Sequence, residues 1–457
     1  MRMYHKNTDI QICYIGGGSR GWAWDFMSDL ALQEDISGTV YLYDIDKAAA
    51  ETNARIGNRV SQSKDAKSIW KYEAIHDIGT ALSGVDFVVI SILPGGFKEM
   101  ASDVHTPEKY GIYQPVGDST GPGGLFRALR TIPIYIDIAN AIKKYAPNAW
   151  VINYTNPMAL CVATLYKVFP DIKAFGCCHE VFSTQKLFAV AAEELLGLHG
   201  LKREDININV LGINHFTWID TATVNGIDLF PVYERFIEKH AINGIEINEK
   251  NLNTNFVCMN LVKFDLYKRF GIAAAAGDRH LVEFVPWYLE EIHNCEKWGF
   301  ELTPVDWRIK NRNELLEKSL LYASGELDIP LMLSGEEGVQ QIIALLGLGD
   351  IVTNVNMPNA GQMLGLGENV VVETNAQFVK DEVRPLEAGE LPAAINLLTK
   401  RHVDVQQAVL HAVFENDKDL AFWAFTQDPL NAKLTLDDAV ALFDEMYENT
   451  KEYLPFR

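Results

Sequence analysis

A glycine-rich segment near the amino terminus has the residue types and spacing of a phosphate-binding turn. It reads G-G-G-S-R-G, follows the apolar run Ile10–Ile15 and precedes a helical pattern over Trp22–Gln33. Glycine in this motif allows a tight turn, close approach of a pyrophosphate and close packing of helix on strand, while the helix amino terminus offers unpaired N–H groups. The segment therefore predicts a dinucleotide site formed by Gly16, Gly18, Ser19, Arg20 and Gly21.

An acidic residue stands where the ribose of a bound dinucleotide is expected. Asp44 directly follows the second expected strand, Thr39–Tyr43. Its carboxylate can accept hydrogen bonds from the ribose hydroxyls but would repel a 2′-phosphate, so NAD is favoured over NADP. The alternative interpretation is an ordinary glycine-rich turn beside an incidental acid. Asp46 is better explained as the cap of the following helix.

Four further segments carry cysteine, histidine, asparagine and aspartate in compact groups. They are Gly117–Gly124 (GDSTGPGG), Asn153–Met158 (NYTNPM), Cys177–Val181 (CCHEV) and Gly212–Trp218 (GINHFTW). Together with the glycine turn, they resemble family 4 of the glycoside hydrolases over most of the chain, from Ile12 to about Glu373. Each segment alone is unspecific, whereas the combination is quite specific.

The resemblance implies hydrolysis of a sugar with the help of NAD and a divalent metal, usually manganese. In that family NAD takes a hydride from C3, a base removes the proton on C2, the glycosidic oxygen leaves, water adds and the hydride returns. Elementary chemistry agrees, because the C2 proton becomes removable only beside a ketone that a metal polarises. Such enzymes are exceptions to catalysis by a pair of carboxylates.

The resemblance also implies a metal site at Cys178 and His215. Cys178 follows an expected strand, and a thiolate beside a divalent ion is deprotonated. Without the resemblance, a buried structural thiol and a core histidine would be the better interpretations. Ligands of this type also accept Co²⁺ or Ni²⁺. Cys177 is expected to point to the opposite side.

Polar residues in the same segments are the expected sugar contacts. The resemblance assigns Asn156 to the substrate hydroxyls, and Asn153 and Asn214 are weaker candidates; each could instead form a turn. Asp118 is either a substrate contact or a solvated loop acid. Gly277-Asp278 resembles the segment that supplies an acid or base in non-phosphorylated α-hexosidases of the family, so Asp278 is a catalytic candidate.

His179 is the second catalytic candidate and also bears on the substrate. Phospho-sugar members carry aspartate directly after the metal cysteine, and the histidine here argues against a 6-phosphorylated sugar. An unperturbed histidine has a pKa of about 6.5 and can supply a proton at neutral pH. The segment Cys178–Val181 looks like that of α-galacturonidases; the α-galactosidase and α-glucuronidase branches are the alternatives.

A uronide carries a carboxylate, which calls for cationic side chains. Arginine can bind it through two parallel hydrogen bonds. We expect Arg279 at the substrate, and the other available cations are Arg127, Arg130 and His280. Any one of them could instead form a surface ion pair.

Two other classes of protein could use the same nucleotide fold. An NAD-dependent sugar or 2-hydroxy-acid dehydrogenase would release NADH and would not need Cys178. A non-catalytic NAD-responsive sensor would have no reason to carry Cys178, His215 and Asn156 together.

The elements that must position these residues read as an α/β protein. Short apolar runs alternate with amphipathic stretches over the first 200 residues, which predicts a Rossmann-type doubly wound parallel sheet in residues 1–200. Residues 201–457 predict a second, α+β and largely helical domain for substrate, metal and oligomerisation. The expected strands are Ile10–Ile15, Thr39–Tyr43, Asp86–Leu93, Ala149–Tyr154, Ile172–Gly176, Ile206–Ile213, Trp218–Val224, Ile351–Asn356 and Asn369–Glu373, and the expected late helices are Leu391–Asn416 and Thr435–Tyr453.

Composition restricts the partners and the compartment. The 457 residues carry a formal net charge of −21, from 61 acidic and 40 basic side chains, which disfavours nucleic acid and anionic membranes. No apolar run is long enough for a membrane span, and the polar start Met1–Ile10 lacks the features of a signal peptide. The six scattered cysteines indicate reduced thiols in the cytoplasm. The family resemblance implies a homodimer or homotetramer.

Overall fold

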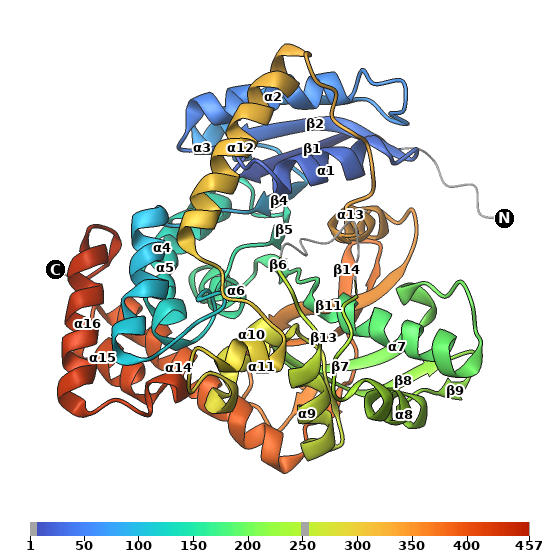
Figure 1. Ribbon diagram of the computed structural model, residues 1–457. Coiled ribbons are helices and arrows are strands. Elements are labelled where there is room, and N and C mark those ends of the chain that lie inside the picture. Colours follow the sequence, from blue (N-terminus) through green and yellow to red (C-terminus); the bar gives the residue numbers. More distant parts are fainter. Residues whose placement is uncertain (1–6, 248–255, 457) are drawn as a thin grey trace.

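A parallel sheet forms the centre of the amino-terminal half (Figure 1). The computed structural model describes residues 7–247 and 256–456. Six parallel strands lie in the order β6-β5-β4-β1-β2-β3, so the Rossmann prediction is confirmed. The third strand was not foreseen. The bounds are β1 (Asn7–Ile15), β2 (Ile36–Tyr43), β3 (Trp70–Ala74), β4 (Phe87–Ile90), β5 (Trp150–Asn153) and β6 (Lys173–Gly176).

Helices cover both faces of this sheet. Ile12 and Tyr14 of β1 face a core built with α1, α2 and α13, whereas Cys13 and Ile15 face a core built with α3, α5 and α6. Burial on both faces explains why these strands are nearly continuous apolar runs. The bounds are α1 (Trp22–Ala31), α2 (Lys47–Val60), α3 (Ile78–Leu82), α5 (Gly121–Tyr145), α6 (Met158–Val168) and α13 (Gly338–Leu345).

Three strands from the carboxyl-terminal half extend the same sheet. β11 (Ile351–Pro358) meets β6 at Asn356 and Gly176, and β13 (Val371–Val379) and β14 (Glu382–Pro385) follow, all antiparallel. The sheet therefore has nine strands in the order β14-β13-β11-β6-β5-β4-β1-β2-β3. A division of the chain at residue 200 stays a prediction, but it does not divide this sheet.

A second sheet carries the Asn214-His215 turn. β7 (Asn207–Ile213) and β8 (Phe216–Val224) correspond to two expected strands and form an antiparallel hairpin. Short strands complete the sheets: β9 (Ile227–Asp228) and β10 (Ala273–Ala274) beside β8, and β12 (Met363–Leu364) with β15 (Gly389–Glu390).

Helices form the rest of the carboxyl-terminal half, as expected. α14 (Ala393–Glu415), α15 (Lys418–Gln427) and α16 (Leu436–Thr450) pack beside α5, where Phe126 contacts Phe425 and Phe443. The remaining helices are α4 (Phe97–His105), α7 (Glu180–Leu196), α8 (Phe230–His240), α9 (Leu261–Phe270), α10 (Asp278–Phe284), α11 (Asn294–Trp298) and short turns at Pro107–Tyr110, Arg203–Asp205, Pro286–Tyr288, Pro429–Asn431 and Lys451–Tyr453.

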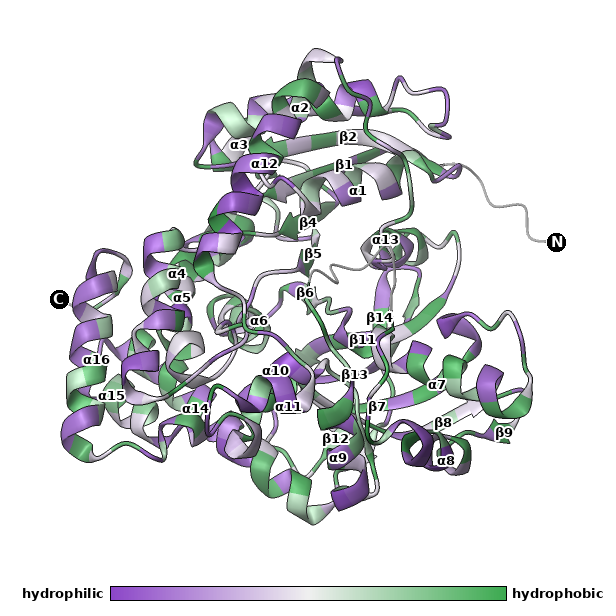
Figure 2. Cartoon of the chain, in the orientation of Figure 1, coloured by the Kyte–Doolittle hydropathy of each residue, from purple (hydrophilic) through white to green (hydrophobic). Residues whose placement is uncertain are grey.

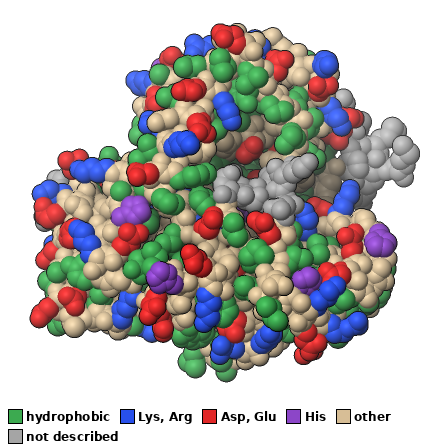
Figure 3. Space-filling model, in the orientation of Figure 1, with side chains coloured by type: hydrophobic (Ala, Val, Ile, Leu, Met, Phe, Trp, Pro, Cys, Tyr) green, Lys and Arg blue, Asp and Glu red, His purple; other side chains and the backbone are tan. Residues whose placement is uncertain are grey.

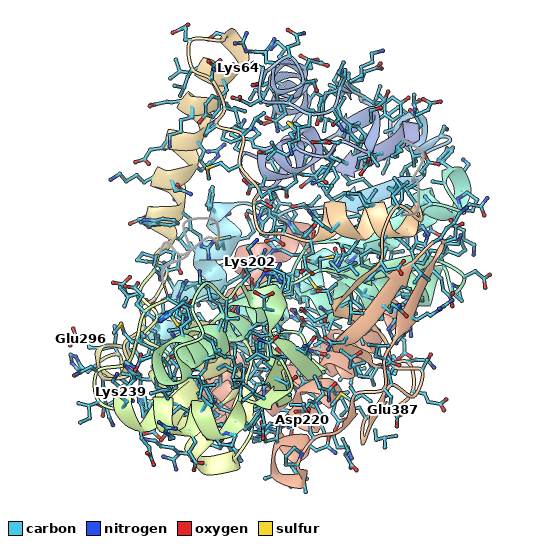
Figure 4. All side chains as sticks on the ribbon, turned by 90° about the vertical axis from the view of Figure 1, so that its right-hand side faces the viewer. Lys64, Lys202, Asp220, Lys239, Glu296 and Glu387 are labelled. Carbon is cyan, nitrogen blue, oxygen red and sulfur yellow. The ribbon has the colours of Figure 1, made fainter. Side chains whose placement is uncertain are left out.

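One long helix, α12 (Val305–Ser324), bridges the two lobes of the molecule (Figure 1). It is mostly hydrophilic (Figure 2), and Val305 and Ser319 are its buried residues. It begins against α4 and ends near α2, where Arg59 pairs with Asp328 at 3.7 Å. Figure 4 shows this end beside the loop that carries Lys64. The helix therefore spans from the substrate half to the nucleotide half.

Acidic and basic side chains are interspersed over the face shown in Figure 3. Among the described residues, no helix combines the length and apolarity that crossing a membrane would require. No disulfide links any of the six cysteines.

A buried aspartate ties the segment after α12 to α1 and gives a test of stability against pH. Both carboxylate oxygens of Asp29 accept hydrogen bonds from Ser334, one from its backbone N–H at 2.8 Å. Burial raises the pKa of Asp29 to about 6 despite these bonds. The folded state thus binds the proton more tightly, so ionisation costs stability as the pH rises from about 4 to 6.

We expect Asp29→Asn to remove this pH-dependent loss. Relative to the unchanged protein, the variant should gain about 2 kcal/mol of unfolding free energy between pH 4 and pH 7. Urea unfolding at several pH values measures the difference, with Asp35→Asn at an exposed position as the control. Parallel pH curves for the unchanged protein and Asp29→Asn would contradict the assignment.

Candidate active site

The glycine turn lies at the carboxyl ends of β1, β2 and β4. The N–H groups of Gly16 and Gly17 both donate to the carbonyl oxygen of Tyr43 at 2.9 Å. Gly16 has a φ of +94°, and a Cβ there would lie 1.9 Å from the carbonyl oxygen of Ser91. The turn is therefore packed so closely on its neighbours that only glycine fits at this position.

Asp44 holds the third glycine of the turn. One oxygen of its carboxylate accepts from the N–H of Gly18 at 2.8 Å, and the other accepts from the N–H of Asp46. Asp46 in turn caps α2 by accepting from the N–H of Ala49, as expected. The partly exposed Asp44 thus stands beside the turn, where a ribose would meet it.

Gly21 corrects one expectation about the motif. A Cβ at Gly21 would meet no atom within 4 Å, so close packing of helix on strand does not explain the glycine. Gly21 is the N-cap of α1, and Ser19 and Arg20 are partly exposed beside it. The open space at the helix amino terminus is suited to a phosphate group. The roles of Ser19 and Arg20 in binding stay predictions.

A chain of hydrogen bonds orients the imidazole of His215. Ser119 Oγ donates to Asp118 Oδ1 at 2.8 Å and therefore accepts from the Nδ1–H of His215 at 2.9 Å. This leaves Nε2 of His215 free to bind a metal, as is usual for ligating histidines. Burial and the neighbouring His280 lower the pKa of His215 to about 3, so the ring is neutral. Asp118 is buried, not a solvated loop acid.

His280 joins this group, although from the sequence we expected it only as one of several cations near the substrate. Its ring centroid lies 3.7 Å from that of His215. Possible ligand atoms of Asp118, His215 and His280 all lie within 4.8 Å of one another. Among the described residues, this cluster is the one that could hold a cation by such spacing.

Cys178 lies next to this cluster, at the end of β6. The side chain of Asn214, the neighbour of His215, lies close enough to the Cys178 thiol to lower its pKa. Asn354 donates both to the carbonyl oxygen of Cys178 at 3.0 Å and to Glu373 at 2.7 Å, and Asn214 donates to Glu373 at 3.1 Å. Burial, Glu373 and Glu180 raise the pKa of the Cys178 thiol. A divalent cation would therefore be needed to form the thiolate.

The neighbouring cysteine faces the other way, as expected. Cys177 is buried against α13, where its thiol donates to Gln341 Oε1 at 2.9 Å. The two cysteines thus differ in environment although they are adjacent in the chain. Cys178 instead lies beside Asn214, the neighbour of His215 in the chain.

The asparagine that ends β5, Asn153, and the one that follows the strand, Asn156, have different environments. Asn156 donates to Asp118 Oδ2 at 3.0 Å, and its buried Oδ1 has no hydrogen-bond partner within the described residues. A hydroxyl group or a cation could satisfy this oxygen. Asn153 is fully buried; it donates to Thr155 and accepts from Thr155 and Tyr135, which corrects the expectation that it contacts sugar.

His179 connects the metal cluster with the nucleotide turn. Its ring stacks on Trp22, the first residue of α1, with ring centroids 5.9 Å apart. Its Nδ1 donates to Glu336 Oε1 at 2.6 Å. Burial alone would lower the pKa of His179, but Glu336 raises it to about 9. The ring is therefore protonated at neutral pH and lies between the two parts of the site.

Glu180 stands among three histidines. Its Oε1 lies 3.6 Å from Nε2 of His280 and 4.0 Å from Nε2 of His179. Burial would raise the pKa of Glu180, but His280, His179 and His215 lower it to about 2. Through His179 and Glu180, the glycine turn, Cys178 and His215 meet in one site.

Asp278 does not reach this site. Its carboxylate is fully buried and accepts from the N–H groups of Val262 and Lys263 at 3.1 Å each, at the start of α9. Burial raises the pKa of Asp278 to about 6. The residue stabilises a helix end, so the expectation that it acts as catalytic acid or base is corrected.

The cationic candidates differ in how many protein groups already bind their side chains. Arg130 is buried and forms a two-point ion pair with Asp103. Arg279 donates to the carbonyl oxygens of Glu301 and Pro115 and stacks on Phe256. These contacts make Arg130 a structural residue. Arg279 is held by two backbone oxygens, and its assignment to the substrate stays a prediction.

Arg127 is better placed than Arg130 or Arg279. Its Nε donates to the carbonyl oxygen of Asn156 at 3.3 Å. Its guanidinium also lies within electrostatic range of Asp118. Arg127 therefore belongs to the site.

Comparison with known proteins agrees with this geometry. A model of the family 4 glycosyl hydrolases matches residues 11–194, and a model of the carboxyl-terminal domain of that family matches residues 210–431. The chain has the fold of a 6-phospho-α-glucosidase from gut microorganisms, solved in complex with NAD and Mn²⁺ (22% identity, TM-score 0.81, 98% of this chain and 99% of that chain).

More similar proteins extend over nearly the whole chain. An α-galacturonidase of Thermoanaerobacter italicus is 60% identical over 98% of both chains. An α-galacturonidase of Bacillus subtilis is 48% identical over 98% of this chain and 99% of the relative. A crystal structure from Bacillus subtilis with 48% identity superimposes with a TM-score of 0.91 and covers 96% of this chain and 100% of that chain. The chain therefore belongs to family 4 of the glycosyl hydrolases.

Proposed function

We propose that this protein hydrolyses α-galacturonides with NAD and a divalent metal, preferably Mn²⁺. The observation that carries the proposal is that the nucleotide turn lies next to the residues expected to bind the metal. His179 stacks on Trp22 beside this turn and directly follows Cys178. A sugar bound there would contact both. The relatives at 48% identity and above support galacturonide as the substrate.

The residues of the glycine turn fit a dinucleotide. The N–H groups at the start of α1 are free of side-chain caps, and space is open at Gly21. Asp44 stands at the end of β2 with a partly exposed carboxylate, which favours NAD over NADP. Gly16, Gly18, Ser19, Arg20 and Gly21 would hold the pyrophosphate, and Asp44 the ribose.

The donor set near Cys178 fits a divalent cation. Cys178 Sγ and His215 Nε2 would bind it, and Asp118 and His280 lie close enough to contribute. The buried Oδ1 atoms of Asn156 and Asn214, which lack protein partners among the described residues, could serve the cation or the sugar hydroxyls. A thiolate, an imidazole and oxygens are acceptable to Mn²⁺, Co²⁺ and Ni²⁺.

When bound, NAD would accept a hydride from C3 of the sugar and the metal would polarise the oxygens at C2 and C3. The protein's own residues would position the sugar, supply a negative charge and deliver a proton. Asn156 and Asp118 position hydroxyl groups, and the ionised Glu180 keeps its negative charge among the histidines. His179 holds a proton through Glu336 and can deliver it to the departing glycosidic oxygen.

The substrate is tested with paired chromogenic sugars. We expect 4-nitrophenyl α-D-galacturonide to be cleaved in the presence of NAD and Mn²⁺ at least about tenfold faster than the matching galactoside, because one charged contact contributes about this much. Initial rates at equal substrate concentration measure the preference, and omission of NAD or addition of a chelator is the control.

Faster cleavage of the galactoside or the α-glucuronide would instead place the chain in those branches of the family. Stoichiometric release of NADH without cleavage would favour a dehydrogenase. A cytoplasmic location and assembly into a homodimer or homotetramer remain predictions; sizing of the purified protein by light scattering addresses the second.

A further inference from the structure

The start of α12 is fixed to the loop that carries Asp118. The N–H of Thr303 donates to the carbonyl oxygen of Pro115 at 3.2 Å, and Nη2 of Arg279 donates to the same oxygen at 2.9 Å. The N–H of Val305 donates to Nε2 of His105 at 3.3 Å. The first turn of α12, which includes Arg308, therefore has a defined position beside the sugar-binding residues.

Arg308 is a guanidinium without an ion-pair partner among the described residues. Its side chain lies within electrostatic range of Arg127, Asp118 and Glu283. Asp118 is engaged with Ser119 and Asn156, and Glu283 accepts from backbone N–H groups at the start of the same loop. Neither carboxylate satisfies Arg308.

The two unpaired arginines come from different helices. Arg127 of α5 contacts the backbone of Asn156, and Arg308 of α12 lies close enough to be repelled by it. Burial and Arg127 lower the pKa of Arg308 to about 10. Two partly buried like charges destabilise each other unless an anion lies between them.

We propose that Arg308 and Arg127 together bind the carboxylate group on C6 of the galacturonide. The inference rests on the proposed function and names the residues that set its preference for a uronide. Arg127 contacts Asn156, and both arginines lie within electrostatic range of Asp118. Asp118 and Asn156 would hold the hydroxyl groups of the same sugar. The pyrophosphate of NAD is the other anion available, but its expected place is the glycine turn at α1. Arginine is suited to a carboxylate because its planar fork can donate two parallel hydrogen bonds.

The test compares Arg308→Gln with Arg312→Gln. Arg312 lies one turn further along α12, is exposed and sits over the Phe97 ring at 6.0 Å, so it is a matched control. We expect Arg308→Gln to raise KM for nitrophenyl α-galacturonide by about tenfold to a hundredfold, as loss of a charged hydrogen bond would. Cleavage of the galactoside should not fall, and the KM for NAD should not rise. Arg308→Lys should recover part of the loss.

A binding measurement separates this inference from the proposed function. Calorimetry with free D-galacturonate and D-galactose needs no turnover, and only galacturonate binding should weaken in Arg308→Gln. If the unchanged protein binds galacturonate through Arg308 but cleaves no galacturonide, the proposed function is wrong, but the carboxylate site formed by Arg308 and Arg127 is confirmed. Equal losses of affinity for galacturonate and galactose in Arg308→Gln, or a raised KM for NAD alone, would overturn the assignment of this carboxylate site.

Discussion

Cys178→Ser is expected to reduce hydrolysis at least about a thousandfold, because a metal ion contributes several kcal/mol to charge stabilisation. Serine keeps the size of the side chain but is a far weaker ligand for a divalent cation than a thiolate. The Cys178 thiol has a raised pKa and needs a cation beside it to ionise. Rates at increasing Mn²⁺ and direct titration of Mn²⁺ binding measure the effect. Both the turnover and the binding should be lost.

Cys177→Ser is the matched control for this experiment. The two residues are adjacent, but Cys177 is buried against Gln341, and serine can make the same hydrogen bond. We expect Cys177→Ser to keep its Mn²⁺ affinity and its rate within a few-fold. Retention of Mn²⁺ binding and hydrolysis by Cys178→Ser would contradict the metal site; NADH accumulation in that variant would point to a dehydrogenase.

Arg130→Met is expected to destabilise the fold by about 3–5 kcal/mol. Arg130 and Asp103 are both about 1% exposed and form a two-point ion pair, so removal of the arginine leaves a buried carboxylate without its partner. The arginine also donates to the carbonyl oxygen of Pro94 at 3.0 Å. Urea or thermal unfolding of the purified variant measures the change.

The double variant Arg130→Met with Asp103→Leu separates pairing from packing. Replacing both partners of a buried ion pair by apolar residues is often close to neutral, so the double variant should recover much of the lost stability. A variant of Arg130 alone that unfolds like the unchanged protein but loses its preference for galacturonide would show instead that Arg130 binds the substrate.

Local sequence patterns were sufficient for most of the central sheet but not for all of it. Five of the six parallel strands are apolar runs next to glycine or polar turns, because both of their faces are buried. β3 alternates between buried Trp70 and Tyr72 and the polar Lys71 and Glu73, so it has no such run. β11 and β13 were recognisable as strands. Their place beside β6 was not, since pairing between distant segments leaves no local pattern.

The site shows the same limit. The motif residues Cys178, His215 and Asn156 lie in one site. Asp278 also belongs to a motif, but its carboxylate caps α9 through the N–H groups of Val262 and Lys263. Its partners lie in a segment to which no motif pointed. Arg308 was missed for a related reason, because it belongs to a hydrophilic helix that any solvent-exposed segment could resemble.

The antiparallel strands that complete the central sheet affect how the protein is made. The edge of β6 gains its partner only when β11, which begins about 175 residues later, has left the ribosome. At usual translation speeds this delay is about 10–35 s. An apolar edge without a partner readily recruits strands of other chains. We therefore expect chains that lack β11 to associate with one another more readily than the finished protein does.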